Sequence, residues 1–291
     1  MGAVYGVSLK YAALSALAGV GIYLLVAEET GDGPLQLQQV LLMLLLGHIC
    51  FVNGLITVLF NLGLGMGMLG KDPGTGAVPL WSYFLFLGFH GPTWLYTRLH
   101  QLKDKRFRVA VANEVEPGWW VGGRYAAELG RCWSGTVDLT CEFPEGCAGK
   151  TERYLLLPCW DGAPPPPEAI ERAANFAVSA REEGDVMVHC AHGRGRSTTV
   201  MCACLVKAGL YSSWEAAFEA IKRQRHVVKL NRGMKAVLAR WQAEYAATTP
   251  ERAAAEVPAC GGEAPSWTLR MLRRTPGLQR FLTGLQQVKE K

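Results

Sequence analysis

Nine residues, HCAHGRGRS from His189 to Ser197, combine a cysteine with glycines, histidines and arginines. They directly follow the apolar run 186–188, VMV, which is typical of a buried parallel strand. Glycines allow the loop after such a strand to curl so that its backbone N–H groups converge, and the N-terminus of the next helix adds positive character there. The pattern therefore predicts an oxyanion cradle. The residues expected to bind phosphate are Ala191, His192, Gly193, Arg194, Gly195 and Arg196.

Cys190 is the expected nucleophile of this loop. The positive field of the loop favours its thiolate, which can attack phosphorus in line and form a phosphocysteine. Arg196 lies where the helix begins, and its planar guanidinium suits a bidentate contact with phosphate. Ser197 can donate a hydrogen bond to the sulfur and help it to leave in the second step, and His189 is expected to orient the loop. An inert buried thiol in a loop that only binds phosphate is the alternative interpretation.

This chemistry also needs an acid for the departing oxygen, which then serves as the base for the hydrolytic water. Asp161 in PCWDGAPPPP is the candidate, because the loops after neighbouring parallel strands meet at one edge of the sheet. Asp161 as a turn residue beside the prolines is the structural alternative. Glu142 and Asp138, which belong to an earlier strand and the loop after it, are the alternative acids.

Residues 112–245 alternate between strand and helix patterns, which predicts an α/β domain whose small, partly parallel sheet is flanked by helices. Apolar and β-branched runs predict strands at 135–140, 154–157 and 186–189. Helices are expected between the prolines at 164–167 and Gly184, and then at 197–208, 214–225 and 232–245. In this arrangement both Asp161 and Cys190 follow strands that end at the same edge.

Residues 1–97 are expected to form a transmembrane region of about three helices. The uncharged segments that carry them are 11–27, 40–70 with a glycine-rich end, and 77–97. The first could instead be a signal peptide, since Lys10 precedes it and Val26-Ala27 fits a cleavage site. The basic stretch 98–111 outweighs Lys10, which predicts a juxtamembrane linker and a catalytic domain on the cytosolic side. With three spans, the N-terminus would lie on the opposite side.

Beyond the α/β domain, residues 246–265 are interpreted as a flexible linker and 266–291 as a basic amphipathic segment that lies on a membrane or on the protein. Nine irregularly spaced cysteines without a C-x-x-C pair argue against a disulfide framework and against a structural zinc site, and favour a reducing compartment. The net charge of +5 is concentrated beside the apolar segment and at the C-terminus, which favours anionic lipid over nucleic acid as a partner.

Cys190, five residues, and then Arg196 and Ser197, preceded by VHC and by an aspartate 29 positions upstream, resemble the dual-specificity branch of the cysteine-dependent phosphatases. The resemblance covers roughly residues 112–245 and includes WWVGG, VDLT and IKRQRHVVKLN. It implies that Cys190 is the nucleophile, Arg196 the phosphate binder, Asp161 the general acid and Ser197 the partner of the thiolate. It also implies that neither a metal nor another cofactor is required.

The predicted function is that of a membrane-anchored phosphomonoester hydrolase, with a dual-specificity protein phosphatase slightly ahead of the alternatives. His192 and Arg194 depart from the commoner pattern of the family by adding positive charge, which suits a substrate with several phosphates or one at an anionic surface. A phospholipid phosphatase that acts on phosphoinositides or phosphatidylglycerophosphate is therefore the first alternative. A phosphate-binding pseudophosphatase is the second.

Overall fold

The computed structural model describes residues 7–28 and 35–246 of the 291-residue chain. The catalytic region and the two N-terminal apolar helices lie within these ranges. Except for Ala246, the expected linker 246–265 and the expected basic segment 266–291 lie outside the described residues.

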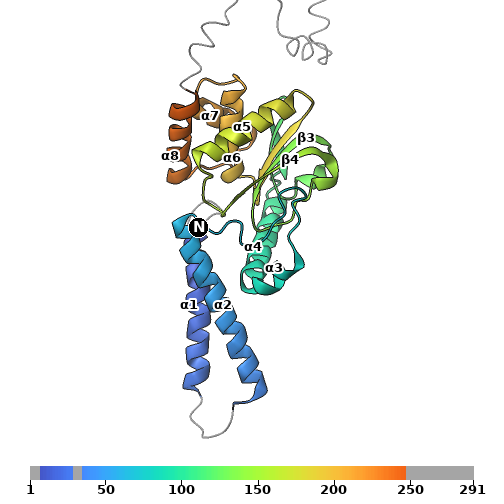
Figure 1. Cartoon of the computed structure of the whole chain (residues 1–291). Coiled ribbons are helices and arrows are strands. Elements are labelled where there is room, and N and C mark those ends of the chain that lie inside the picture. The colour runs from blue at the N-terminus through green and yellow to red at the C-terminus, as the bar shows by residue number, and fades with distance from the viewer. Residues whose placement is uncertain (1–6, 29–34, 247–291) are drawn as a thin grey trace, which may run out of the picture. The chain divides into compact units, whose positions relative to one another are not determined.

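A five-stranded sheet with the order β1-β2-β5-β3-β4 forms the centre of the catalytic region (Figure 1). Its strands are β1 (Ala112–Glu116), β2 (Trp119–Gly123), β3 (Trp133–Thr140), β4 (Thr151–Cys159) and β5 (Val186–Cys190). β1 and β2 pair antiparallel, and all the other pairs are parallel. The α/β class with a partly parallel sheet is thus confirmed. β5 is the central strand, and all five of its residues are buried, in agreement with its largely apolar sequence.

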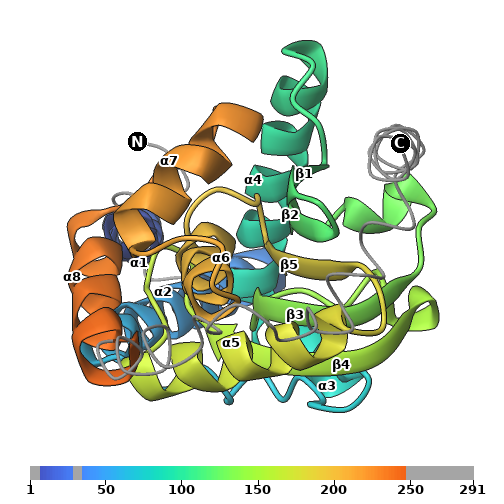
Figure 2. The same cartoon turned by 90° about the horizontal axis from the view of Figure 1, so that it is seen from above.

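Four helices follow β4 and β5 in the chain, of which the first three contact the sheet and the last packs on two of the other helices (Figure 2). They are α5 (Pro167–Arg181), α6 (Arg196–Lys207), α7 (Trp214–Gln224) and α8 (Arg232–Trp241), and a π-helical turn (Gln242–Ala246) extends α8. Two 3₁₀ turns, Ala126–Leu129 and Ala148–Lys150, connect strands. The helix boundaries confirm the sequence patterns, and α5 begins with Pro167 in its first turn, where a proline costs no hydrogen bond.

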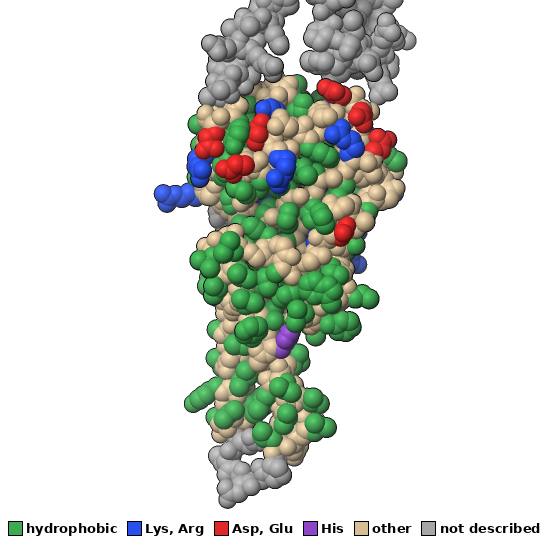
Figure 3. Space-filling view, in the orientation of Figure 1, with side chains coloured by type: hydrophobic (Ala, Val, Ile, Leu, Met, Phe, Trp, Pro, Cys, Tyr) green, Lys and Arg blue, Asp and Glu red, His purple; other side chains and the backbone are tan. Residues whose placement is uncertain are grey.

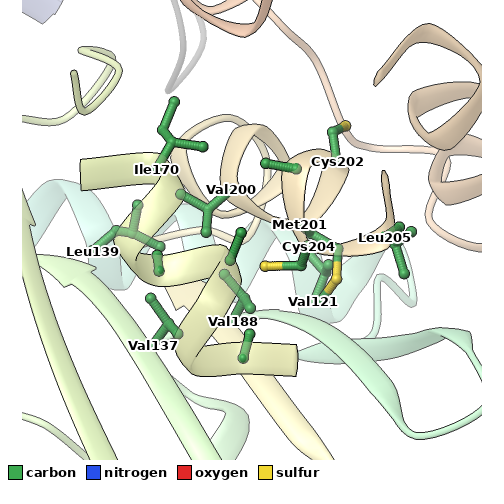
Figure 4. Close-up of a cluster of buried hydrophobic side chains, with 14 of the residues drawn as sticks. Val121, Val137, Leu139, Ile170, Val188, Val200, Met201, Cys202, Cys204 and Leu205 are labelled. Carbon is green, nitrogen blue, oxygen red and sulfur yellow. The ribbon is translucent and has the colours of Figure 1, made fainter. Parts of the chain in front are cut away.

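Helix α6 lies at the centre of the hydrophobic core (Figure 4). Its residues from Arg196 to Leu205 are all buried, and they contact side chains of β3, β5 and α5 such as Val137, Val188 and Ile170. A helix buried on every side is held rigidly, because close packing leaves no room for it to shift. The loop between β5 and α6 is therefore anchored at both of its ends by the core.

Two long apolar helices, α1 (Val7–Ala27) and α2 (Leu37–Leu62), lie side by side (Figure 1). The Ser15 hydroxyl donates to the Cys50 carbonyl oxygen across the pair at 2.8 Å, and Gly63 ends α2 in the left-handed region with φ of 66°. Both helices are long and apolar enough to cross a membrane, and few of their side chains are buried. Figure 3 shows this part covered by hydrophobic side chains, whereas the acidic and basic side chains gather over the catalytic region.

The third expected span, 77–97, does not form one continuous apolar helix. This segment forms the short α3 (Leu80–Leu85) and, after a break at Phe86, α4 (Leu87–Arg106), and among the described residues only α1 and α2 have the length and composition of a span. Helix α4 buries a polar stripe at 3- to 4-residue spacing, with His90, Thr93, Thr97 and Gln101, which would be unfavourable in lipid. The helix also runs through most of the expected linker 98–111.

The paired helices change the expected topology of the N-terminus. Because α1 leads away from the catalytic region and α2 returns, the start of α1 and the end of α2 lie at the same end of the hairpin (Figure 1). Two spans would therefore leave the N-terminus on the side of the catalytic domain, rather than on the opposite side as three spans would.

Candidate active site

The loop from Cys190 to Arg196 is held in a tight curl by backbone contacts. Gly193 adopts a φ of 64°, and a Cβ atom at this position would lie 2.4 Å from the carbonyl carbon of Gly122, so only glycine fits. The Arg194 carbonyl oxygen accepts a hydrogen bond from the Lys229 amide at 2.9 Å, and the Gly195 oxygen accepts one from Thr199 at the start of α6. The predicted curled loop before the helix N-terminus is thus present.

Arg225 fastens this loop from outside. Its Nε donates to the Gly193 oxygen at 2.8 Å, and its Nη2 donates to the His192 oxygen at 3.3 Å. Its Nη1 donates to Asn113 Oδ1 and to the Ala110 oxygen, on and beside β1. Arg225 thus has a structural role and ties the loop to β1.

Cys190 is buried at the end of β5, and its Sγ lies 3.4 Å from the Oγ of Ser197. Burial alone would raise the pKa of the thiol. The charge of Arg196 and the hydrogen bonds from the Ser197 hydroxyl and from the amides of Ser197 and Arg194 outweigh this effect, so the pKa of Cys190 is lowered. The geometry therefore favours a thiolate at this position.

Arg196 is fixed at the ends of β3 and β4. Its Nη1 donates to the Cys159 oxygen at 2.7 Å and to the Leu139 oxygen at 3.0 Å. Both Nη atoms contact the Glu142 carboxylate, at 2.7 and 3.3 Å, and Nη2 lies 3.1 Å from Asp161 Oδ1. Its buried Nε has no hydrogen-bond partner among the described residues. One N–H group of this arginine is thus left for an anion.

Asp161 lies in the loop after β4, as predicted, and its side chain is only 13 % exposed. Burial raises the pKa of Asp161, and although Arg196 opposes this, the neighbouring Glu142 carboxylate adds to it. The loop is held by Asn231, whose Nδ2 donates to the Gly162 oxygen at 2.8 Å. The structure thus brings Asp161 and Cys190 to the same arginine, with a raised pKa for the carboxyl and a lowered pKa for the thiol.

The two alternative acids, Glu142 and Asp138, are both engaged in buried contacts with cationic side chains. Glu142 is buried against Arg196, whose charge and hydrogen bonds lower its pKa although burial alone would raise it. Asp138 is also buried, and it accepts hydrogen bonds from Lys71, from Tyr154 and from the amide and hydroxyl of Thr140. Glu142 is therefore a partner of Arg196, a role that the sequence pattern did not assign to it.

Asp138, Glu145 and His189 form a buried cluster beneath the loop, and their ligand atoms are close enough together to hold a metal ion. The ammonium group of Lys71 already neutralises Asp138 and also donates to Thr140. Glu145 accepts a hydrogen bond from His189 Nε2 at 2.6 Å. Although burial opposes both shifts, this contact lowers the pKa of Glu145 to about 2, and Asp138 and Glu145 raise that of His189 to about 9. These ion pairs balance the charges of the cluster and hold the His189 ring against Glu145.

His192 and Arg194 do not add positive charge to the cradle, contrary to the expectation from sequence. Arg194 Nη2 pairs with Asp104 Oδ1 on α4 at 2.6 Å. The His192 ring packs on the rings of His100 and Tyr96, with centroids 4.3 and 5.8 Å away. Burial and the neighbouring positive charges hold the pKa of His192 well below its ordinary value, so the ring is neutral. Both side chains dock the loop on α4.

Two further cysteines lie near the site. Cys141 Sγ is 3.7 Å from the Cys159 oxygen, and both residues are free thiols. Burial raises the pKa of Cys159 to about 12 and that of Cys141 well above its ordinary value. Neither therefore offers a reactive thiolate beside Cys190 near neutral pH.

Residues 163–244 of this chain match a family model that is described as the catalytic domain of dual specificity phosphatases. The match includes Cys190, Arg196 and Ser197 and begins two residues after Asp161. Rat dual specificity protein phosphatase 5 is 39 % identical over 100 residues, and mouse dual specificity protein phosphatase 12 is 32 % identical over 137 residues. The enzyme class and the resemblance predicted from the cysteine loop are thereby confirmed.

The similarity to these relatives covers only part of each chain. The two alignments cover 34 % and 43 % of this chain, and 25 % and 39 % of the relatives, so the chain spans about a quarter to two fifths of their length. Among solved structures, a mouse dual specificity phosphatase complexed with zinc tungstate matches 48 % of this chain and 91 % of its own, with 24 % identity and a TM-score of 0.43. PTPMT1 in complex with PI(5)P matches 48 % and 99 %, with 20 % identity and a TM-score of 0.41.

Proposed function

We propose that the dual-specificity phosphatase domain of this chain hydrolyses a phosphomonoester through a cysteinyl-phosphate intermediate. The Cys190 thiolate attacks phosphorus, so that a P–S bond forms while the P–O bond to the leaving group breaks. Asp161 gives its proton to the departing oxygen, for which its raised pKa prepares it. Water then attacks the phosphocysteine, Asp161 takes back a proton, and the electron pair of the P–S bond returns to sulfur.

The surrounding groups stabilise the charge that moves through these steps. The N–H groups of the loop and of Arg196 bind the phosphoryl oxygens. Glu142 holds the guanidinium of Arg196 in place. The Ser197 hydroxyl, 3.4 Å from the sulfur, donates to the thiolate as it leaves in the second step.

The same proposal includes a membrane anchor made of α1 and α2. Their length and the outward-facing apolar side chains support two antiparallel spans. Both ends of the hairpin then lie on the same face of the membrane as the catalytic domain, and the free cysteines of that domain favour the reducing, cytosolic face.

The contact between the acid loop and the base of the helical hairpin supports a phospholipid substrate. Trp160, next to Asp161, donates from Nε1 to the Leu64 oxygen just after α2, at 2.7 Å. It also belongs to one buried cluster with Val7 and Tyr11 of α1 and with Phe89 of α4. The ammonium of Lys10 lies over the Tyr11 and Tyr96 rings, at 4.5 and 4.7 Å from their centroids, and Tyr96 contacts His192 of the cradle.

These contacts place the catalytic loops beside helices that a bilayer would surround. A phosphate group that extends from the membrane surface is closer to such a site than a phosphorylated side chain of a soluble protein. We therefore favour phospholipid over phosphoprotein, which reverses the order that the sequence suggested.

The test is phosphate release by the full chain in lipid nanodiscs, with Cys190→Ser as the control. Nanodiscs that contain phosphatidylglycerophosphate or a phosphoinositide are compared with phosphotyrosine and phosphothreonine peptides. We expect release from lipid that depends on Cys190. Preferential release from the peptides would reject the lipid assignment, and binding without any release would indicate a pseudophosphatase.

A further inference from the structure

A cavity of about 390 Å³ lies between helices α3 and α4 and the catalytic region. Leu87, Gly91 and Trp94 of α4 form one wall, and Arg124, Glu142 and Phe143 contribute to the other. A cavity of this size holds a small ligand rather than a few water molecules. None of the catalytic steps proposed above uses it.

Arg124 is the unusual member of this lining. Its guanidinium stacks 4.0 Å from the centroid of the Phe143 ring, and its Nη1 is buried without a hydrogen-bond partner among the described residues. It also forms no ion pair with any of them within 4 Å. Arg124 as a whole is half-buried, but leaving a buried N–H group of a cation without a partner is costly, and an anionic partner would remove that cost. Arg124 therefore points to an anionic group that the ligand supplies.

The cavity adjoins the catalytic loop through two of its lining residues. The Arg124 amide donates to the oxygen of Ala191, the residue after Cys190, at 3.2 Å. The Glu142 carboxylate holds Arg196 at 2.7 Å. Glu142 thus links the lining of the cavity to Arg196 of the catalytic loop.

Besides Arg124, Glu142 and His90, the lining of the cavity is largely apolar. The Leu87 and Trp94 side chains belong to residues that are more than half exposed, and Tyr83 and Pro144 add to the lining. The neighbouring surface of α3 continues this character with Leu80, which is 77 % exposed, and Phe84, which is 80 % exposed. The ligand thus requires an acidic group next to apolar chains.

We propose that this cavity binds the phosphodiester and glycerol backbone of a phospholipid whose terminal phosphomonoester occupies the Cys190 loop. Arg124 pairs with the phosphodiester, and the acyl chains leave past Leu87 and Trp94 towards the exposed face of α3. This inference rests on the proposed phospholipid phosphatase function. It defines the substrate class as glycerophospholipids with a phosphodiester in addition to the scissile phosphate.

Binding tests the cavity without any need for turnover. The probe is dioctanoyl phosphatidylglycerol, which has the phosphodiester and no phosphomonoester, added to the full chain in detergent, with dioctanoylglycerol for comparison. We expect Arg124→Gln to weaken binding of the phospholipid roughly 10- to 100-fold, the range of a charge-assisted hydrogen bond. Arg124→Lys should retain most of the binding. Gly91→Leu should also weaken it, because a Cβ there meets open space and a larger side chain would fill the cavity.

Arg153→Gln is the matched control. Arg153 also stacks on a phenylalanine ring, that of Phe176 at 5.2 Å, but it has partners in Ser179 and Glu183 and lies at the other end of β4 from the loop of Asp161. This variant should bind the probe as the wild type does. Equal binding of the phospholipid by Arg124→Gln and wild type would overturn the proposal.

Kinetics show whether the cavity and the cradle hold one substrate. For dioctanoyl phosphatidylglycerophosphate, Arg124→Gln should lower kcat/KM roughly 10- to 100-fold. Dioctanoyl phosphatidic acid has no phosphodiester, so the loss should be several times smaller with it, and dioctanoyl phosphatidylglycerol should inhibit the wild type competitively. Equal losses with both substrates, or non-competitive inhibition, would overturn the proposal. Absence of turnover by the wild type would refute the proposed function instead, and the binding result would still decide the cavity.

Discussion

Replacement of Glu142 by glutamine tests why the pKa of Glu142 is lowered while that of the neighbouring Asp161 is raised. The Glu142 carboxylate contacts both Nη atoms of Arg196, and both residues are buried. Loss of one partner of a buried ion pair costs about 3–5 kcal/mol. Arg196 keeps its contacts with Asp161 and with two backbone oxygens, so we expect about 3 kcal/mol, at the lower end of that range.

The stability loss has a definite pH dependence. Because the pKa of Glu142 is lowered in the folded chain, its stabilising contribution is complete above its unfolded value and disappears as the pH falls through the folded value. At pH 7, about 3 kcal/mol corresponds to a decrease in Tm of roughly 6–12 °C for a domain of this size. The difference between wild type and Glu142→Gln should narrow below about pH 4.

The same substitution should change the pH profile of activity. The negative charge of Glu142 helps to raise the pKa of Asp161, so its removal lowers that pKa. Asp161 then loses its proton at lower pH, and the alkaline limb of kcat/KM should shift to lower pH. The assay is hydrolysis of a soluble aryl phosphate by the full chain in detergent, with calorimetry on the same samples. The exposed Glu152→Gln is the control. An unchanged Tm together with an unchanged alkaline limb would refute this account of Glu142.

Three other substitutions test the remaining parts of the site. Ser197→Ala should raise the pKa of Cys190 by removing a hydrogen bond to the thiolate, which moves the acid limb of the pH profile to higher pH and slows breakdown of the phosphoenzyme in single-turnover experiments. Asp161→Asn should slow hydrolysis of alkyl phosphates roughly 10²- to 10⁴-fold and of aryl phosphates much less, because phenolates depart without a proton. Gly193→Ala should abolish phosphate binding, measured by vanadate titration, since its Cβ would overlap the Gly122 backbone; tight vanadate binding by this variant would contradict the described loop.

The sheet and the cysteine loop were predictable because their signals are local. The apolar run that ends at Cys190 and the glycines that follow it leave few conformations to the chain, and the parallel arrangement then brings Asp161 near by. The helical boundaries were equally clear because prolines and glycines mark them. The roles of His192 and Arg194 were not predictable in this way, since they depend on Asp104 and His100 of a helix some ninety residues earlier.

The N-terminal region shows the same limit. The uncharged segment before Arg98 has the composition of a span, but composition cannot show that the helix breaks at Phe86 or that it buries a polar stripe against the catalytic region. Glu142 likewise could be identified only as one acidic residue among several after β3. Its pairing with Arg196 depends on three strands and α6 meeting at one edge.

The buried contact between Lys71 and Asp138 has a consequence for the smallest piece of the chain that can fold. A fragment that begins at Arg98, where the charged residues resume, would leave Asp138 and Glu145 beneath the loop with His189 as their one cationic partner in the described part of the chain. It would also uncover Trp160 beside Asp161. We expect such a fragment to be unstable, whereas one that begins before Lys71, and so also contains the whole of α4, should fold. Arg98 would then mark a change in composition and not the start of the folded enzyme. The residues that follow the α1–α2 hairpin, including Lys71, would belong to the enzyme.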